Sequence, residues 1–325
     1  MMPTSPAART LTAALCVELG NSGQLVGPAT GDGQPRFALF HAANSICSQK
    51  ARAVLAHHGI PYVSHTLDIF AGQTYLPDYV RLRLIGCESI GLPLVTTHTG
   101  STSATAHGCD PAVVPTLVDW RTDEVIVDSK RICLHLDATM SDASRLRPAA
   151  LQREIDAELD IVDELPNYQL LTGRQAGADP RPERLRKLDG AEFSRSKVRR
   201  CDEHLAGYGG DPALIAAYRA KRAKELNAAQ ALFSEQSMQR AIATVAAASA
   251  QLDERLPGGD AVWLLGDAPT LADLFWAIEL LRLENLGFGS LWDHGKLPRV
   301  GRFVATAKTL NSVRTAVLEW PGAQF

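Results

Sequence analysis

The feature of this sequence that most constrains its fold is an apolar run, a polar turn and a helical segment within residues 37–52. The run Phe37–Phe40 is too short and too apolar for a surface helix, so it predicts a buried strand. Residues 48–57 repeat apolar side chains at helical spacing, which predicts a helix with Ser48 as its cap. The chain is therefore expected to open an α/β unit here.

The turn between this strand and this helix carries Ser45 and Cys47, which we expect just before the helix N-terminus. Unpaired backbone N–H groups and the helix dipole favour negative charge at such a position. A thiolate is the anion that a cysteine or a bound thiol can supply there. The turn is thus a candidate site for thiol activation, and a plain helix cap beside a buried cysteine is the alternative.

Length and composition limit the possible functions. A chain of 325 residues with 46% hydrophobic residues can form about two domains with sizeable cores. A net charge of −3 argues against a nucleic-acid or membrane partner, because both attract accumulated positive charge. The six cysteines are widely spaced, which indicates no metal site and no disulfide scaffold and favours reduced thiols in the cytoplasm. Residues 11–19 are too short and too interrupted to span a bilayer.

The expected first domain, residues 36–140, follows an N-terminal arm and contains two further segments. Residues 1–35 are rich in Pro, Thr, Ser and Gly and predict a flexible arm without a functional role. Residues 61–68 alternate as a strand that would lie parallel to the first one, across the helix. Residues 83–112 are interrupted by glycines and predict a long inserted loop near the site.

Two further strands, within 113–120 and 125–129, are separated by a four-residue turn and predict a hairpin, followed by a helix over 129–137. The order β-α-β then β-β-α is that of a thioredoxin-like domain with a mixed sheet. Pro115 belongs at the start of a strand, where a cis bond can turn backbone Val114 toward a ligand. An ordinary trans proline is the alternative.

The second part of the chain, residues 148–322, predicts an all-α domain because strand patterns nearly vanish. It holds an amphipathic segment at 148–165 and an Ala-rich stretch at 211–256 that forms one bent helix or two. Thr270-x-x-Asp273 is a capping box with a structural role. The basic run 181–205 predicts a solvated face, which could also attract carboxylates or phenolates.

Three motifs at these separations resemble the glutathione S-transferase superfamily: Ser45-Ile-Cys-Ser48, Val113-Val-Pro-Thr-Leu117 ahead of Asp128-Ser129, and the Gly266-Asp-x-x-Thr-Leu-Ala-Asp273 capping box. The first of them, with Arg52, looks like the zeta-class motif. More closely, most of residues 36–322 resembles the bacterial glutathione-dependent reductive dechlorinases of chlorinated hydroquinones, especially the dichlorohydroquinone type. The resemblance implies a homodimer whose helical-bundle domain forms the pocket for a small aromatic acceptor.

The resemblance also lends roles to matching residues. Asp128 and Ser129 would hold the γ-glutamyl ammonium and carboxylate of glutathione. Backbone Val114, exposed by cis-Pro115, would pair with the cysteinyl part of the tripeptide. Ser45 would donate a hydrogen bond to the glutathione thiolate.

In the mechanism that the resemblance implies, glutathione displaces chloride from the tautomerised ring. Cys47 then attacks the sulfur of the glutathionyl conjugate and frees the hydroquinone, and a second glutathione resolves the mixed disulfide. His41 is a candidate proton donor with a structural role as the alternative.

Three rival functions stay open. A zeta-type maleylacetoacetate isomerase would use glutathione without Cys47. A general glutathione transferase or glutathionyl-substrate reductase would share the thiol site and differ in its acceptor pocket. A non-catalytic glutathione-binding protein would keep the fold without needing both Ser45 and Cys47.

Overall fold

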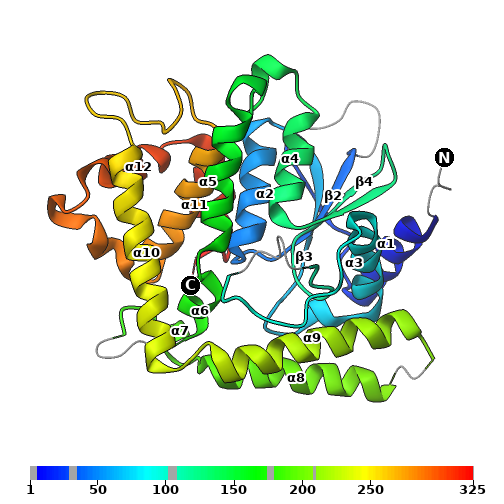
Figure 1. Ribbon diagram of the computed structural model, residues 1–325. Helices are drawn as coiled ribbons and strands as arrows, with labels where there is room; N and C mark the ends of the chain where they lie inside the picture. Colours follow the sequence, from blue (N-terminus) through cyan, green and yellow to red (C-terminus); the bar gives the residue numbers. More distant parts are fainter. Residues whose placement is uncertain (1–5, 29–34, 102–107, 174–178, 208–209, 325) are drawn as a thin grey trace.

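A computed structural model describes residues 6–28, 35–101, 108–173, 179–207 and 210–324. Figure 1 shows a sheet with helices on both sides at one end of the molecule and a group of helices at the other. The helices α8 (Gly190–Gly207) and α9 (Pro212–Ala231) lie side by side along one edge and contact each other extensively.

The sheet has five strands in the order β1-β3-β2-β4-β5. Strand β2 lies parallel to β3 and antiparallel to β4, while β1 pairs antiparallel with β3 and β5 pairs antiparallel with β4. The strands are β1 (Gln24–Val26), β2 (Phe37–His41), β3 (Tyr62–Thr66), β4 (Thr116–Asp119) and β5 (Glu124–Val127).

Side chains of β2 alternate between two cores, as the pleat of a strand requires. Phe37 and Leu39 enter the core shared with α2 (Ile46–His57) and α4 (Ser129–Ala138), whereas Ala38 and Phe40 enter the core shared with α1 (Pro6–Glu18) and α3 (Pro77–Ile90). A Cβ at Gly86 of α3 would lie 2.7 Å from a methyl of Val127, so the missing side chain lets α3 approach β5 closely.

The helical part is built around α11 (Leu271–Asn285), which is buried from Leu271 to Leu283 and packs against α2, α5 and α12. Its capping box is formed, because the Thr270 side chain accepts from the Asp273 N–H and the Asp273 carboxylate accepts from the Thr270 N–H at 2.8 Å. The Thr270 hydroxyl also donates to this carboxylate at 2.7 Å. The remaining helices are α5 (Gln152–Glu164), α6 (Asn167–Thr172), α7 (Glu183–Arg186), α10 (Glu235–Arg255), α12 (Pro298–Ala307) and α13 (Asn311–Val313). Short 3₁₀ turns are η1 (Gln73–Tyr75), η2 (Asp142–Ser144), η3 (Ala149–Leu151), η4 (Phe288–Leu291) and η5 (Asp293–Gly295), and η6 (Arg314–Leu318) is a π-helical turn.

The predicted fold class, a thioredoxin-like domain with a mixed sheet followed by helices, is confirmed. The parallel β2 and β3 pair, the 116–127 hairpin and the cis Val114–Pro115 bond are all present. The Ala-rich stretch forms two helices, α9 and α10, and Asp211 caps the first of them.

Three sequence predictions are corrected. The flexible arm 1–35 instead contains α1 and β1, because Leu15 is fully buried against α3 and β1 extends the sheet, while residues 1–5 and 29–34 lie outside the described part. The predicted loop 83–112 is helical through Ile90, and its residues 102–107 are outside the description. The N-cap of α2 is Ser45 and not Ser48, so Cys47 lies inside the first helical turn.

We predict that α1 is a docked part of the domain. Leu15→Ala should lower the free energy of unfolding of α1 by about 2–4 kcal/mol, because it leaves a cavity against α3. Hydrogen exchange of the α1 amides measures this effect. The control Val17→Ala, whose side chain is 83% exposed, should change it by less than about 0.5 kcal/mol. Equal effects of both changes would contradict docking.

Candidate active site

The turn into α2 presents two polar side chains at the edge of a cavity. The Ser45 hydroxyl accepts a hydrogen bond from the Ser48 N–H at 3.3 Å, so its own proton stays available for an anion. Cys47 is only 4% exposed and lies in the first helical turn, where N–H groups and the helix dipole favour a thiolate. Both residues line the larger of the two cavities described below.

Cationic groups from two elements lie close to Cys47. Arg282 of α11 donates a hydrogen bond to the Asn44 carbonyl at 2.6 Å, and burial lowers the pKa of this guanidinium to about 10. Lys50 of α2 forms a fully buried ion pair with Asp163 of α5 at 2.7 Å. Despite its burial, Asp163 and the nearby Cys47 hold the pKa of Lys50 above its ordinary value. The turn therefore lies between a helix N-terminus and two cationic side chains.

Cys47 also borders a second, smaller cavity, which contains every other predicted glutathione-binding residue. Val114, Pro115, Asp128 and Ser129 line it together with Cys47. Val114 borders the larger cavity as well, so the two cavities share this residue and Cys47. All six predicted site residues therefore line one or both of the two cavities that meet at Cys47. The role of each residue stays a prediction.

The wall of the smaller cavity contains a carboxylate and a hydroxyl group that are available to a polar ligand. Asp128 caps α4 at a φ of 77°, in the region that favours glycine, and burial followed by the nearby Asp163 raises its pKa to about 6. An ammonium group beside Asp128 would relieve this unfavourable burial of charge. The buried Ser129 hydroxyl has no hydrogen-bond partner among the residues that the structure describes, which suits it to a ligand carboxylate.

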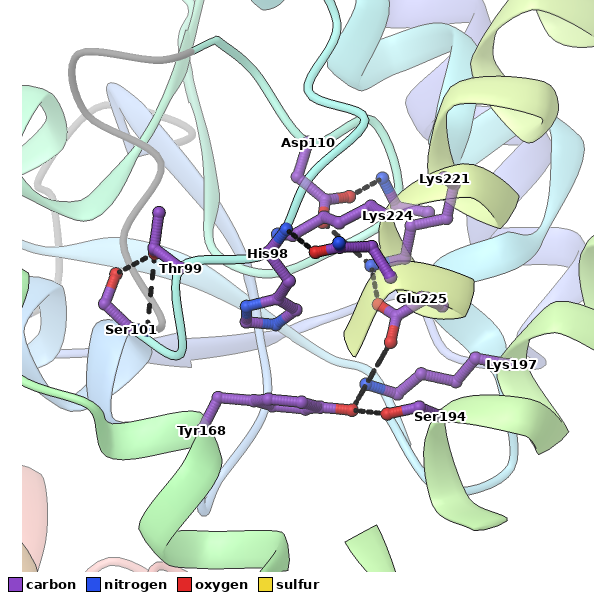
Figure 2. Close-up of polar contacts among 12 residues, drawn as sticks. His98, Thr99, Ser101, Asp110, Tyr168, Ser194, Lys197, Lys221, Lys224 and Glu225 are labelled. Atoms are coloured by element: carbon purple, nitrogen blue, oxygen red, sulfur yellow. Dashed lines mark hydrogen bonds and ion pairs between the residues drawn. The ribbon is translucent and has the colours of Figure 1, made fainter. Parts of the chain in front are cut away.

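The larger cavity has aromatic and charged walls. Figure 2 shows Lys221 and Lys224 of α9 meeting Asp110, with Lys197 of α8 beside Tyr168 of α6. The His98 ring stacks on the Tyr168 ring with centroids 4.3 Å apart, and the His98 N–H donates to Asn227 Oδ1 of α9 at 2.9 Å. Residues after α3 are thereby tied to α9. The side chains of this wall are Phe70, Tyr75, His98, Tyr168, Phe193, Lys197, Lys221, Lys224 and Glu225.

A buried charge network holds this wall in place. The Asp110 carboxylate accepts from Lys221 Nζ and Lys224 Nζ, each at 2.8 Å, and Lys221 Nζ also lies 2.7 Å from a Glu225 oxygen. Burial alone would raise the pKa of Asp110, but the two lysines hold it well below its ordinary range. Likewise Lys197 and Lys221 hold the pKa of the buried Glu225 down to about 2.

Sequence reasoning missed several residues of this cavity. The basic run 181–205 was predicted to be a solvated face, and Arg195 and Arg199 are indeed exposed, but Lys197 lines the cavity and Arg181 is buried. Arg282 left a readable signal, because it is one of the few charged residues in a largely apolar helix. Tyr168 and His98 left no signal, since neither stands in a motif.

Two other candidates take structural places. His41 is fully buried between Ser64, at 2.7 Å, and Arg52, at 3.1 Å, and it is not among the residues that line either cavity. Asp119, Glu124 and His135 offer three ligand atoms within 4.8 Å of one another. However, Arg36 and His135 already bond both Asp119 oxygens, which is the arrangement of an ion-pair network.

Comparison with known proteins agrees with the fold. Residues 44–139 match the family described as glutathione S-transferase, N-terminal domain, and residues 235–306 match glutathione S-transferase, C-terminal domain. The chain belongs to the glutathione S-transferase family of enzymes, and glutathione is its co-substrate. Residues 140–234, which contain α8 and α9, lie between the two matched segments.

Curated relatives are similar over most of the chain. Two proteins named 2,5-dichlorohydroquinone reductive dechlorinase, from two strains of Sphingobium indicum, are each 38% identical over 293 residues, which is 89% of this chain and 84% of each relative.

Solved structures share the fold. The β-etherase LigF from Sphingobium sp. strain SYK-6 has a TM-score of 0.55 at 16% identity, covering 86% of this chain and 98% of that one. A glutathione S-transferase-I bound with lactoylglutathione has a TM-score of 0.50 at 14% identity, covering 87% and 98%. In the described part of the chain, the helices lack the length and apolar character that crossing a bilayer requires.

We predict that Asp110 is essential for the stability of the cavity wall. Asp110→Ala should lower the free energy of unfolding by about 3–5 kcal/mol in urea titrations, because Lys221 and Lys224 lose a buried partner. Since the pKa of Asp110 is lowered on folding, its contribution is present above about pH 4 and is lost as the pH falls through the folded value.

The matched control is Asp202→Ala, which removes an exposed ion pair with Arg222. It should cost less than about 1 kcal/mol, because solvent screens such pairs. A loss in Asp110→Ala as small as that of the control would contradict the network described above.

Proposed function

We propose that this enzyme reductively dechlorinates a chlorinated hydroquinone, with 2,5-dichlorohydroquinone as the substrate to test first. The observation that carries the proposal is the position of Cys47, which borders both the cavity suited to glutathione and the cavity with aromatic walls. A protein thiol between the two substrates is what thiol exchange on a glutathionyl-aryl conjugate requires. The 38% identity to two dechlorinases over most of the chain supports the same reaction.

The proposed reaction has three steps, which consume two molecules of glutathione for each chloride. First, the glutathione thiolate attacks the chlorinated carbon of the ring in its keto tautomer; a C–S bond forms and chloride leaves. Second, the Cys47 thiolate attacks the glutathione sulfur; an S–S bond forms, the C–S bond breaks and the ring carbon takes a proton. Third, another glutathione thiolate attacks the mixed disulfide, which releases oxidised glutathione and restores Cys47.

The proposed roles follow from the surroundings of each residue. Ser45 donates its hydroxyl proton to the glutathione thiolate, while Asp128 and Ser129 hold the ammonium and carboxylate of the tripeptide. The backbone of Val114, before cis-Pro115, pairs with the cysteinyl part. The thiolate of Cys47 is supported by the N-terminus of α2 and by Arg282.

The setting of the enzyme is also proposed. All six cysteines are free thiols, which supports a reducing compartment such as the cytoplasm. We further propose a homodimer, as the family resemblance implies, and the molar mass from light scattering tests it.

The role of Ser129 gives one prediction. Ser129→Ala should weaken glutathione binding about 10- to 100-fold in calorimetry, which corresponds to the loss of a hydrogen bond to a charged group. It should not lower the free energy of unfolding, because the hydroxyl has no partner within the described structure. Ser249→Ala is the control, since that buried hydroxyl donates to the Val245 carbonyl in α10, and glutathione affinity should stay unchanged. Unchanged affinity in Ser129→Ala would remove this residue from the site.

The role of Cys47 gives another prediction. The purified enzyme should release chloride from 2,5-dichlorohydroquinone in the presence of glutathione, and Cys47→Ser should accumulate the glutathionyl-hydroquinone, measured by mass spectrometry. Cys16→Ser, which alters a thiol on α1, should keep full turnover. Full dechlorination by Cys47→Ser would refute the two-thiol mechanism, and no chloride release by the unaltered enzyme would refute the proposed function.

A further inference from the structure

In the wall of the larger cavity formed by α8 and α9, lysines outnumber the carboxylates that pair with them. Its lysines are Lys197, Lys221 and Lys224, and the carboxylates that contact them are Asp110 and Glu225. Both carboxylates are ionised, because the lysines hold their pKa values low. The five groups therefore carry one surplus positive charge when every lysine is protonated. A cavity of this kind is complementary to a ligand with one negative charge.

Lys197 is the least compensated of the three lysines. Lys221 and Lys224 each lie within 2.8 Å of a carboxylate, whereas Lys197 Nζ is 3.4 Å from Glu225 and donates to the neutral Tyr168 hydroxyl at 3.0 Å. Its burial, partly offset by Glu225, lowers the pKa of this lysine to about 8. An ammonium group has three N–H donors, so these two contacts leave one for a ligand in the cavity that Lys197 lines.

Aromatic rings surround this ammonium group. Nζ of Lys197 lies 4.3 Å from the centroid of the Tyr168 ring and 4.5 Å from that of Phe193. Phe70 lines the same cavity, with its ring centroid 5.8 Å from that of Phe193. Faces and edges of rings are good partners for another ring, so the site suits an anion carried on an aromatic molecule better than an aliphatic carboxylate.

Lys197 lies beside Tyr168 in Figure 2. We propose that it binds a ring oxygen of the acceptor in its phenolate form, between the rings of Tyr168 and Phe193. The inference rests on the proposed function and deepens it, because it names the group that recognises the hydroxyl of a chlorinated hydroquinone. Lys197 comes from α8, in the segment between the two matched family regions. Recognition of the phenolate is thus assigned to a helix outside the matched glutathione S-transferase regions.

The test uses 4-nitrophenol, which cannot be dechlorinated and whose phenolate absorbs visible light. Titrated into glutathione-saturated enzyme, it should bind as the phenolate, with its pKa lowered by one unit or more. Lys197→Met should bind it at least tenfold more weakly and abolish the shift, since one pKa unit is a tenfold preference for the charged form. The control Lys187→Met removes a lysine whose side chain is 76% exposed and should behave as the unaltered enzyme does.

The dependence of binding on pH adds a second readout. Affinity for the phenolate should fall as the pH rises through about 8, where Lys197 loses its proton. The other titratable groups facing Lys197 come from three elements. They are Glu225, Lys221 and Lys224 of α9, His98 and Asp110 of the connection between α3 and β4, and Tyr168 of α6. Lys197→Arg should restore phenolate binding and remove this alkaline decline, because a guanidinium stays charged.

The outcomes separate this inference from the proposed function. If Lys197→Met binds 4-nitrophenolate as tightly as the unaltered enzyme, the inference is wrong whether or not dechlorination occurs. If binding depends on Lys197 but no chloride is released from 2,5-dichlorohydroquinone, the phenolate site stands and the proposed function is wrong. Tighter Lys197-dependent binding of maleate than of 4-nitrophenolate would also overturn the inference. The affinity of each variant for glutathione shows whether the variant is folded. If Lys197→Met has lost that affinity, phenolate binding by Lys197→Arg tests the inference instead.

Discussion

The buried ion pair between Lys50 and Asp163 is the constraint on which the geometry of the thiol site depends. Lys50 is one turn beyond Cys47 in α2, and Asp163 belongs to α5, so a single contact at 2.7 Å joins the sheet-bearing part to the helical part at the turn that carries the chemistry. Removing either partner would leave an uncompensated charge in the interior, which proteins tolerate poorly. Arg282 reinforces the same junction from α11 through its contact with the Asn44 carbonyl. The position of the thiol is therefore set by elements from both halves of the chain.

A second set of buried charges fixes the wall of the larger cavity, as this ion pair fixes the turn that carries the thiol. Asp110 follows the loop after α3, and it holds two lysines of α9, while Asn227 of the same helix binds the backbone of His98. These contacts attach a glycine-rich segment to a helix pair that lies far away in the sequence. The cavity has both charged and aromatic side chains in its wall, and it borders Cys47. The larger cavity and the turn that carries Cys47 are thus built by different segments of the chain, which agrees with function residing in sites more than in folds.

Several elements of the fold were readable from the sequence because their signals are local. Phe37–Phe40 could only be a short buried strand, Pro115 had to begin one, and Thr270 with Asp273 is a cap that two side chains form between themselves. The acceptor cavity was not readable, because Tyr168, Lys197 and His98 meet only through tertiary packing. The docking of α1 was missed for a similar reason: a Thr-rich and Pro-rich composition obscured Leu15, which is buried by contact with α3 and not by any pattern of its own.

Strand β1 has a consequence for solubility. An open mixed sheet exposes the backbone hydrogen-bonding groups of its edge strands, and these groups can pair with strands of other molecules. The three-residue strand β1 (Gln24–Val26) pairs with the five-residue strand β3, so β1 and not β3 is the edge strand on this side of the sheet. A strand of three residues is too short to template aggregation. The opposite border, β5, begins with the charged Glu124, which discourages the same misassociation. Strand β1, which precedes the main domain in the sequence, therefore hinders the pairing of this sheet with strands of other molecules.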